Sequence, residues 1–317
     1  MEIGIAVAVA TLVVFVLLEL KTSRPDGTMI NIKPFRRILL AIMPTRTEAL
    51  VYFDEYIDAT NLLPYIARAR AAYGANMTHL CVAAAATALS ANPAMNRFVA
   101  GNRLYQRNQR YISFSMKKQK LNRSAQLATV KMEIRDNESL RGFCTRVNAQ
   151  IGEERSGKKT KGDKEVESFN LLPRPLLRVG VPLFKMLDYY NLLPGGFIKD
   201  DPLYTSIFMA NLGSLAMGAG YHHLFEYGSC PLFLMIGRIE QAPMVVDGEV
   251  KVRPRLHVRF TYDERIDDGL NARFGIEAMV QILKDPESFY GAPEDENAPP
   301  LWPLPEGKLV YGPGTDG

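Results

Sequence analysis

An uninterrupted apolar run near the N-terminus constrains this chain more than any other feature. Residues Ile3 to Leu18 contain no charged side chain. As a helix, residues 3–20 span about 27 Å at about 1.5 Å per residue, enough to cross the hydrocarbon layer of a membrane. A cleaved signal peptide is the alternative, but no basic residue precedes the run and no small-x-small cleavage site follows it. We therefore expect one transmembrane anchor over residues 1–20.

The segment after this run is basic. Residues 21–44 are predicted to form a juxtamembrane linker, and its charges, by the positive-inside rule, predict a single-pass protein with its main domain in the cytoplasm. Its last part, Lys33–Arg37 followed by Ile38–Met43, either lies on anionic lipid headgroups or is a plain strand or linker. The basic residues concerned are Lys21, Arg24, Lys33, Arg36 and Arg37.

Composition narrows the protein class. The chain has 317 residues, of which 47% are hydrophobic, so it can bury one large core or two modest ones. Its net charge is only +4, and no stripe of Lys and Arg interleaved with aromatic residues is present, which argues against a nucleic-acid-binding protein. The three cysteines are widely spaced and form no CxxC pair, so we expect neither a disulfide framework nor a metal site.

Hydrophobic periodicity predicts one mixed α/β domain over residues 45–290 and a Pro/Gly-rich tail over 291–317, disordered or extended. The pair Asp247-Gly248 between apolar residues predicts a tight hairpin. Helices are expected at 61–72, at 78–88 with Thr78 as the cap, at 138–153 and at 268–284. Strands are expected at 49–57, 110–116, 126–134, 204–210, 231–239, 244–252 and 255–262.

Two middle segments allow more than one interpretation. Arg155–Lys164 is rich in lysine, which predicts a mobile loop, with phosphate binding as the alternative. Leu171–Ile198 is apolar and contains four prolines. It predicts a helix that lies over a substrate cleft, a second subunit or the membrane, or else a plain core helix.

The strongest functional signal is the segment Tyr262–Phe274, where a predicted strand leads into a predicted helix. It contains four carboxylates and two arginines. Together with two blocks upstream, Asn76–Arg97 and Ser206–Gly213, it resembles the CoA-dependent acyltransferase superfamily. That superfamily includes chloramphenicol acetyltransferase and the catalytic domain of the acyltransferase component of 2-oxo-acid dehydrogenase complexes. The resemblance implies an α/β fold with a chloramphenicol acetyltransferase-like mixed sheet and flanking helices.

The family signature is His-x-x-x-Asp-Gly, and this chain reads Glu264-x-x-x-Asp268-Gly269. The family histidine removes a proton from a thiol, and a Ser or Thr hydroxyl stabilises the oxyanion. Here Glu264 holds the histidine position and Ala210 holds the hydroxyl position. The resemblance assigns an orienting role to Asp268 and structural roles to Gly269 and Arg265. Asn211 and Ser214 are the residues that would form the site wall and take over the oxyanion.

Glu264 has two interpretations. Burial near Asp263, Asp267 and Asp268 would raise the pKa of Glu264 and make it a base. Alternatively, Glu264 forms a structural salt bridge with Arg265 or Arg273. The pair His222-His223 supplies an alternative base, but adjacent side chains usually point apart, so we expect no metal there.

The resemblance also implies a CoA thioester as substrate and a homotrimer with active sites between subunits. The chain carries no Asp-Lys-Ala lipoyl hairpin, so a lipoyl group or other acyl carrier would belong to a partner protein. The leading hypothesis is a membrane-anchored acyltransferase with Glu264 as a variant base. A catalytically inactive trimeric scaffold or acyl-ligand-binding module is the alternative, and the sequence names neither acyl group nor acceptor.

Overall fold

The computed structural model describes residues 2–118, 127–156 and 171–311. Its α-helices are α1 (Glu2–Leu20), α2 (Pro34–Ile42), α3 (Leu62–Tyr73), α4 (Met77–Ala91), α5 (Leu140–Arg155), α7 (Arg174–Tyr189), α8 (Gly195–Asp200), α9 (Gly269–Lys284) and α10 (Pro286–Tyr290). Its strands are β1 (Gly27–Met29), β2 (Leu50–Asp58), β3 (Arg97–Ala100), β4 (Arg103–Arg107), β5 (Tyr111–Lys117), β6 (Leu127–Glu133), β7 (Ile207–Asn211), β8 (Leu232–Val246) and β9 (Glu249–Asp263). Short 3₁₀ turns cover Pro93–Asn96 and Gly213–Leu215.

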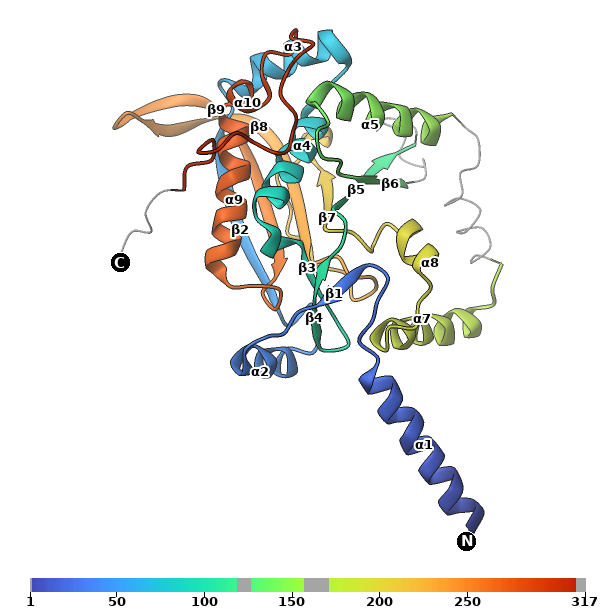
Figure 1. The fold of residues 1–317 in the computed structure, drawn as a ribbon. Helices are drawn as coiled ribbons and strands as arrows, with labels where there is room; N and C mark the ends of the chain where they lie inside the picture. Colours follow the sequence, from blue (N-terminus) through green and yellow to red (C-terminus); the bar gives the residue numbers. More distant parts are fainter. Residues whose placement is uncertain (1, 119–126, 157–170, 312–317) are drawn as a thin grey trace.

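A six-stranded mixed sheet forms the centre of the protein (Figure 1). Its order is β2-β9-β8-β7-β5-β6, and β7 runs parallel to both β5 and β8 while the other pairs are antiparallel. A separate three-stranded sheet has the order β1-β4-β3. The predicted α/β class with a mixed sheet is thus confirmed.

The hairpin predicted at Asp247-Gly248 is present and joins β8 to β9. Both residues have positive φ, 54° and 79°, as a tight turn between strands of this twist requires. The predicted break between strands at 239 and 244 is wrong, because β8 continues through Pro243. Beyond Glu240, β8 pairs only with β9. The N–H that Pro243 lacks would therefore not have bonded a further strand.

Helices α4, α5 and α9 pack on one face of this sheet and enclose the main core. Nearly all of α4 is buried, as its run of alanines predicts for a helix in close contact with its neighbours. The N-cap of α4 is Asn76 and not Thr78, a correction to the sequence analysis. The Asn76 side chain accepts hydrogen bonds from the backbone N–H groups of Thr78 and His79, and the His79 ring bonds the Asn76 N–H in return.

Residues 21–44 are built into the folded body and are not a free linker. Strand β1 pairs with β4, and Arg24 and Asp26 are buried. Periodicity could not reveal this, because the partners lie more than seventy residues away along the chain. The first part of this segment therefore fixes the end of α1 against the domain.

The tail is also more ordered than expected. Residues 291–311 contain no helix, yet Leu301 is buried, and its N–H donates to the carbonyl of Glu138 at 2.8 Å. The Thr87 hydroxyl donates to the Leu301 carbonyl at 3.1 Å. This part of the tail is therefore ordered and packed on the domain, and it is not disordered.

Two exposed helices occupy the predicted apolar segment at 171–198. No residue of α7 is buried, so the interpretation as a plain core helix is wrong. Helix α1 also buries no residue and has the length and hydropathy of a membrane span, a test that a signal sequence also passes. Most of the predicted loop at 155–164 lies outside the described residues.

Candidate functional site

The turn between β9 and α9 presents the signature residues. Strand β9 ends at Asp263, and α9 begins after Asp268, whose carboxylate accepts a hydrogen bond from the N–H of Asn271 at 3.2 Å. Asp268 is thus an N-cap, a position where a carboxylate stabilises the helix dipole and an orphan N–H. Its side chain is exposed, as is Gly269.

Three ion pairs hold this turn, and one of them is fully buried. Arg265 binds Asp263 through both carboxylate oxygens, at 2.8 and 2.7 Å, and neither side chain is more than 3% exposed. Asp267 pairs with Arg97, and with Arg36 at 3.5 Å. A bidentate pair of planar groups restricts geometry as well as contributing energy. Arg265, to which the resemblance assigns a structural role, thus contacts Asp263 directly, and the two other arginines bind Asp267.

Glu264 is the exposed member of this turn. Its backbone N–H donates to the Ala49 carbonyl at 3.0 Å, and its side chain lies at the surface of the chain. The burial expected for Glu264 is therefore absent in the single chain. The salt-bridge alternative is also wrong for Arg265, which is held by Asp263. Arg273 pairs with Glu277 at 3.7 Å.

Tyr262 lies beneath the turn and is 4% exposed. Burial, together with the nearby carboxylates of Glu264 and Asp268, raises the pKa of Tyr262 to about 12. Its hydroxyl therefore stays protonated well above neutral pH. The sequence analysis missed this residue, since a tyrosine at a strand end resembles any other core aromatic.

Asn211 and Ser214 form a second group at the end of β7. The Asn211 side chain donates to the Thr78 hydroxyl at 3.0 Å and accepts from the Ser214 N–H, also at 3.0 Å. The Ser214 hydroxyl donates back to the Asn211 carbonyl at 2.8 Å. This turn needs Gly213, because a Cβ there would lie 2.3 Å from the Gly237 carbonyl oxygen.

The register of the sheet separates Asn211 from Glu264. Asn211 is level with Ile236 on β8, which is level with Val258 on β9. Glu264 lies six residues beyond Val258, about 20 Å along the sheet at about 3.3 Å per residue. One chain therefore does not bring the two groups together.

His222 and His223 lie in the loop before β8. Their rings stack on each other, and His222 stacks on Phe233 with ring centroids 4.0 Å apart. The expectation that the two side chains point apart is wrong. Each Nδ1 contacts a backbone carbonyl, at 2.7 and 2.9 Å. Within the described ranges no group of three or more His, Cys, Asp or Glu side chains could hold a metal ion.

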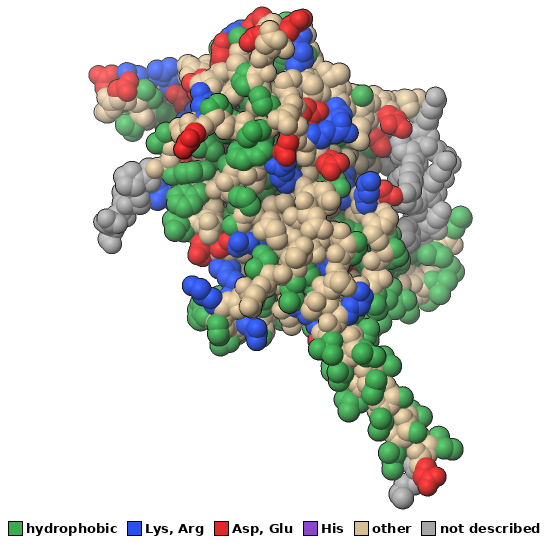
Figure 2. Space-filling model, in the orientation of Figure 1, with side chains coloured by type: hydrophobic (Ala, Val, Ile, Leu, Met, Phe, Trp, Pro, Cys, Tyr) green, Lys and Arg blue, Asp and Glu red, His purple; other side chains and the backbone are tan. Residues whose placement is uncertain are grey.

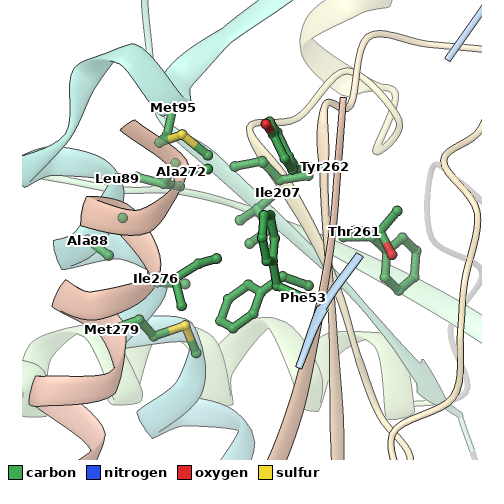
Figure 3. Close-up of a pocket in the computed structure, with 15 residues that line it drawn as sticks. Phe53, Ala88, Leu89, Met95, Ile207, Thr261, Tyr262, Ala272, Ile276 and Met279 are labelled. Carbon is green, nitrogen blue, oxygen red and sulfur yellow. The ribbon is translucent and has the colours of Figure 1, made fainter. Parts of the chain in front are cut away.

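An apolar cavity of about 40 Å³ lies between helices α4 and α9 and the sheet. Figure 3 shows Phe53, Ile276, Met279 and Tyr262 among the residues around it. Its lining contains no charged side chain. The sequence could not reveal this cavity, because its walls come from several separate elements.

Part of the chain matches a known family in sequence, and most of it matches solved structures in fold. Residues 226–290 match the family model of the 2-oxoacid dehydrogenases acyltransferase (catalytic domain). A stretch of 49 residues is 41% identical to the dihydrolipoyllysine-residue succinyltransferase component of 2-oxoglutarate dehydrogenase complex 1 of Arabidopsis thaliana. That stretch is 16% of this chain and 11% of the plant protein.

Two solved structures share the fold over most of the chain. A probable dihydrolipoamide acetyltransferase from Listeria monocytogenes has a TM-score of 0.54 at 17% identity, covering 81% of this chain and 94% of that one. The truncated catalytic core of a 2-oxoacid dehydrogenase multienzyme complex from Thermoplasma acidophilum has a TM-score of 0.50 at 15% identity, covering 82% and 99%. The resemblance inferred from the sequence is confirmed.

Proposed function

We propose that this chain is a membrane-anchored acyltransferase. It has the fold and signature region of the CoA-dependent acyltransferase superfamily. It would transfer an acyl group from a thioester, first of all acyl-CoA, to an acceptor. Helix α1 would be the anchor, with the domain in the cytoplasm. The observation that carries this proposal is the signature turn: ion pairs hold Asp263, Arg265 and Asp267, and Glu264 is left exposed.

The reaction follows from this arrangement. Glu264 would accept the proton of the acceptor's hydroxyl, amine or thiol as that atom attacks the thioester carbonyl. The tetrahedral intermediate would collapse with loss of the CoA thiolate, which takes up the proton. A carboxylate with an ordinary pKa near 4.3 is a weak base for a thiol near 8.5. Burial of the carboxylate by a neighbouring subunit would raise its pKa toward that of the thiol.

A site shared between copies of the chain fits the separation of the two groups. Glu264 and Asn211 lie about 20 Å apart along the sheet of one chain, by its register and a rise of about 3.3 Å per residue. We propose a homotrimer in which Glu264 of one copy faces Asn211 and Ser214 of another. Asn211 already donates to Thr78, and these polar side chains would form the oxyanion wall that Ala210 cannot supply.

One observation favours a second function. Ala210 has no hydroxyl, and the loss of one oxyanion donor costs on the order of 3 kcal/mol in activation free energy. A catalytically inactive trimeric scaffold that binds acyl ligands would keep the turn and the fold without needing that donor.

Acyl-CoA titration separates the two functions. The full-length protein in detergent micelles is titrated with acetyl-CoA and longer acyl-CoAs, and bound ligand and released thiol are followed together. Acyl transfer predicts thiol release that Glu264→Gln abolishes while the melting temperature is unchanged. Binding without release in every variant would support the scaffold or a missing acceptor, and no binding at all would contradict both functions.

A matched control and a restored base make this test sharper. Glu249→Gln makes the same change at an exposed site on the β8–β9 hairpin and should leave thiol release unaltered. Glu264→His introduces the family base at the same position. An acyltransferase site should retain or increase thiol release in this variant.

A further inference from the structure

Helix α7 carries an apolar stripe that nothing in the described chain covers. Leu176, Val179, Leu183 and Met186 recur at three- and four-residue spacing and are 46–67% exposed. The adjacent side of the helix packs on the domain through Phe184 and Leu187. A stripe of this spacing is the face with which an amphipathic helix normally contacts an apolar environment.

Helix α2 has a stripe of the same kind. Phe35, Ile38 and Ile42 are 57–72% exposed, while Leu40 on the other side is buried in the main core. Lys33 and Arg37 beside the stripe are exposed. Apolar residues between exposed cations are typical of helices that lie in the headgroup region of an anionic membrane.

Both helices lie at the end of the domain where α1 leaves it (Figure 1). Helix α2 is on one side of that point and α7 on the other. Figure 2 shows hydrophobic side chains on α7 and α1, and Lys and Arg side chains at the α2 end. Three exposed cations also accompany the stripe of α7: Arg174, Arg178 and Lys185.

The end of α1 is fixed to this face by direct contacts. The side chain of Arg103 pairs with Glu19 at 3.0 Å, and the Asn191 side chain donates to the Lys21 carbonyl at 2.9 Å. Arg24 pairs with Asp188 near the end of α7 at 2.9 Å. If α1 spans a bilayer, these contacts keep α7 next to the surface of that bilayer.

We propose that α2 and α7 dock on an anionic lipid bilayer, with their apolar stripes in the headgroup region of the membrane that α1 crosses. This inference rests on the proposed anchor and not on acyl transfer. Arg36 of α2 binds the Arg265 carbonyl at 3.3 Å and the Asp267 carboxylate at 3.5 Å. Docking of α2 therefore holds the turn with Glu264 close to the membrane surface, where an amphipathic acceptor would be presented.

Site-specific labelling of the full-length protein tests the inference. The native cysteines are buried, so a cysteine introduced at the surface takes up an environment-sensitive fluorophore selectively. Val179→Cys and Phe35→Cys report on the two stripes. Val245→Cys, on the hairpin away from α1, is an exposed control. Each protein is reconstituted into phosphatidylcholine vesicles with and without phosphatidylglycerol, and quenching by nitroxide-labelled lipids is measured.

Docking predicts quenching several-fold stronger at positions 179 and 35 than at 245, with a further increase in vesicles that contain phosphatidylglycerol. Replacing Arg174, Arg178 and Lys185 by glutamine should remove that increase at position 179. Equal quenching at 179 and 245 in protein that resists alkaline carbonate would overturn the inference alone. Extraction by carbonate would overturn the anchor and this inference together. A third outcome is that lipids do not quench the fluorophore, while its emission shifts and a second copy of the chain crosslinks to it. This would assign the stripe to a protein interface and would also overturn the inference.

Discussion

The guanidinium of Arg24, four residues beyond α1, lies 2.9 Å from the carboxylate of Asp188 near the end of α7, and the two side chains are 1% and 14% exposed. Arg24 also binds Asp26, which pairs with the buried Arg107. Burial lowers the pKa of Arg24, but the carboxylates of Asp188 and Asp26 outweigh it and raise the pKa above its usual value. The base of α1 is thus joined to α7 by a buried charge network.

Asp188→Asn should destabilise the domain by about 1–3 kcal/mol, because Arg24 would be left buried with Asp26 as its remaining carboxylate partner. Thermal unfolding of the full-length protein in detergent measures this. Asp247→Asn makes the same chemical change at the hairpin turn, where Asn tolerates the positive φ, and should be neutral. Equal melting temperatures for both variants would show that the Arg24–Asp188 pair does not hold α7 to α1.

Arg265→Lys tests the geometry of the signature turn. Lysine keeps the charge but cannot bind both oxygens of Asp263 in one plane, so we expect a loss of about 1–3 kcal/mol. Arg265→Ala should cost more, roughly 3–5 kcal/mol, because Asp263 would then be buried without its partner. Chemical denaturation gives both values. A lysine variant as unstable as the alanine variant would mean that bidentate geometry is not what stabilises the turn.

Two variants of Asp268 distinguish its role as a helix cap from the role of its charge. Asp268→Ala removes the cap of α9 and should cost about 1 kcal/mol, whereas Asp268→Asn retains an acceptor for the Asn271 N–H and should cost less. If Asp268 also orients the acyl-transfer site, both variants should lower thiol release, although the first lowers the melting temperature more. Unchanged release in Asp268→Asn would limit this residue to its cap.

Local chemistry explains what the sequence could predict. The Asp247-Gly248 turn needs positive φ at both residues, and Asp268 before an apolar helix is a cap by composition alone, so both features are readable from neighbours. The first part of the chain shows the opposite. Arg24 resembles an ordinary juxtamembrane charge, and its partner Asp188 lies 164 residues away, so no local pattern can pair them.

In the candidate site, too, local motifs can be recognised from the sequence, whereas contacts between distant segments cannot. Glu264 and Asp268 are recognised from a contiguous motif, but the exposure of Glu264 depends on Asp263, Arg265 and Asp267 taking the buried positions around it. The distance between Glu264 and Asn211 depends on the register of β7, β8 and β9. Register is set by pairing between strands, which a single motif does not contain.

Lys131 predicts an alkaline dependence of stability. It donates to the carbonyls of Ile198 and Asp201, at 3.0 and 2.9 Å, and burial lowers the pKa of Lys131 from 10.5 to about 8. Below pH 8 both folded and unfolded states bind the proton, so the burial penalty is fully present. Between pH 8 and 10.5 only the unfolded state keeps it, so the free energy of unfolding should rise with pH, by at most about 3 kcal/mol and less for a half-buried group. Lys131→Met should flatten this rise, whereas Lys251→Met on the exposed hairpin should not. Parallel curves of unfolding free energy against pH for wild type and Lys131→Met would show that Lys131 does not cause the rise.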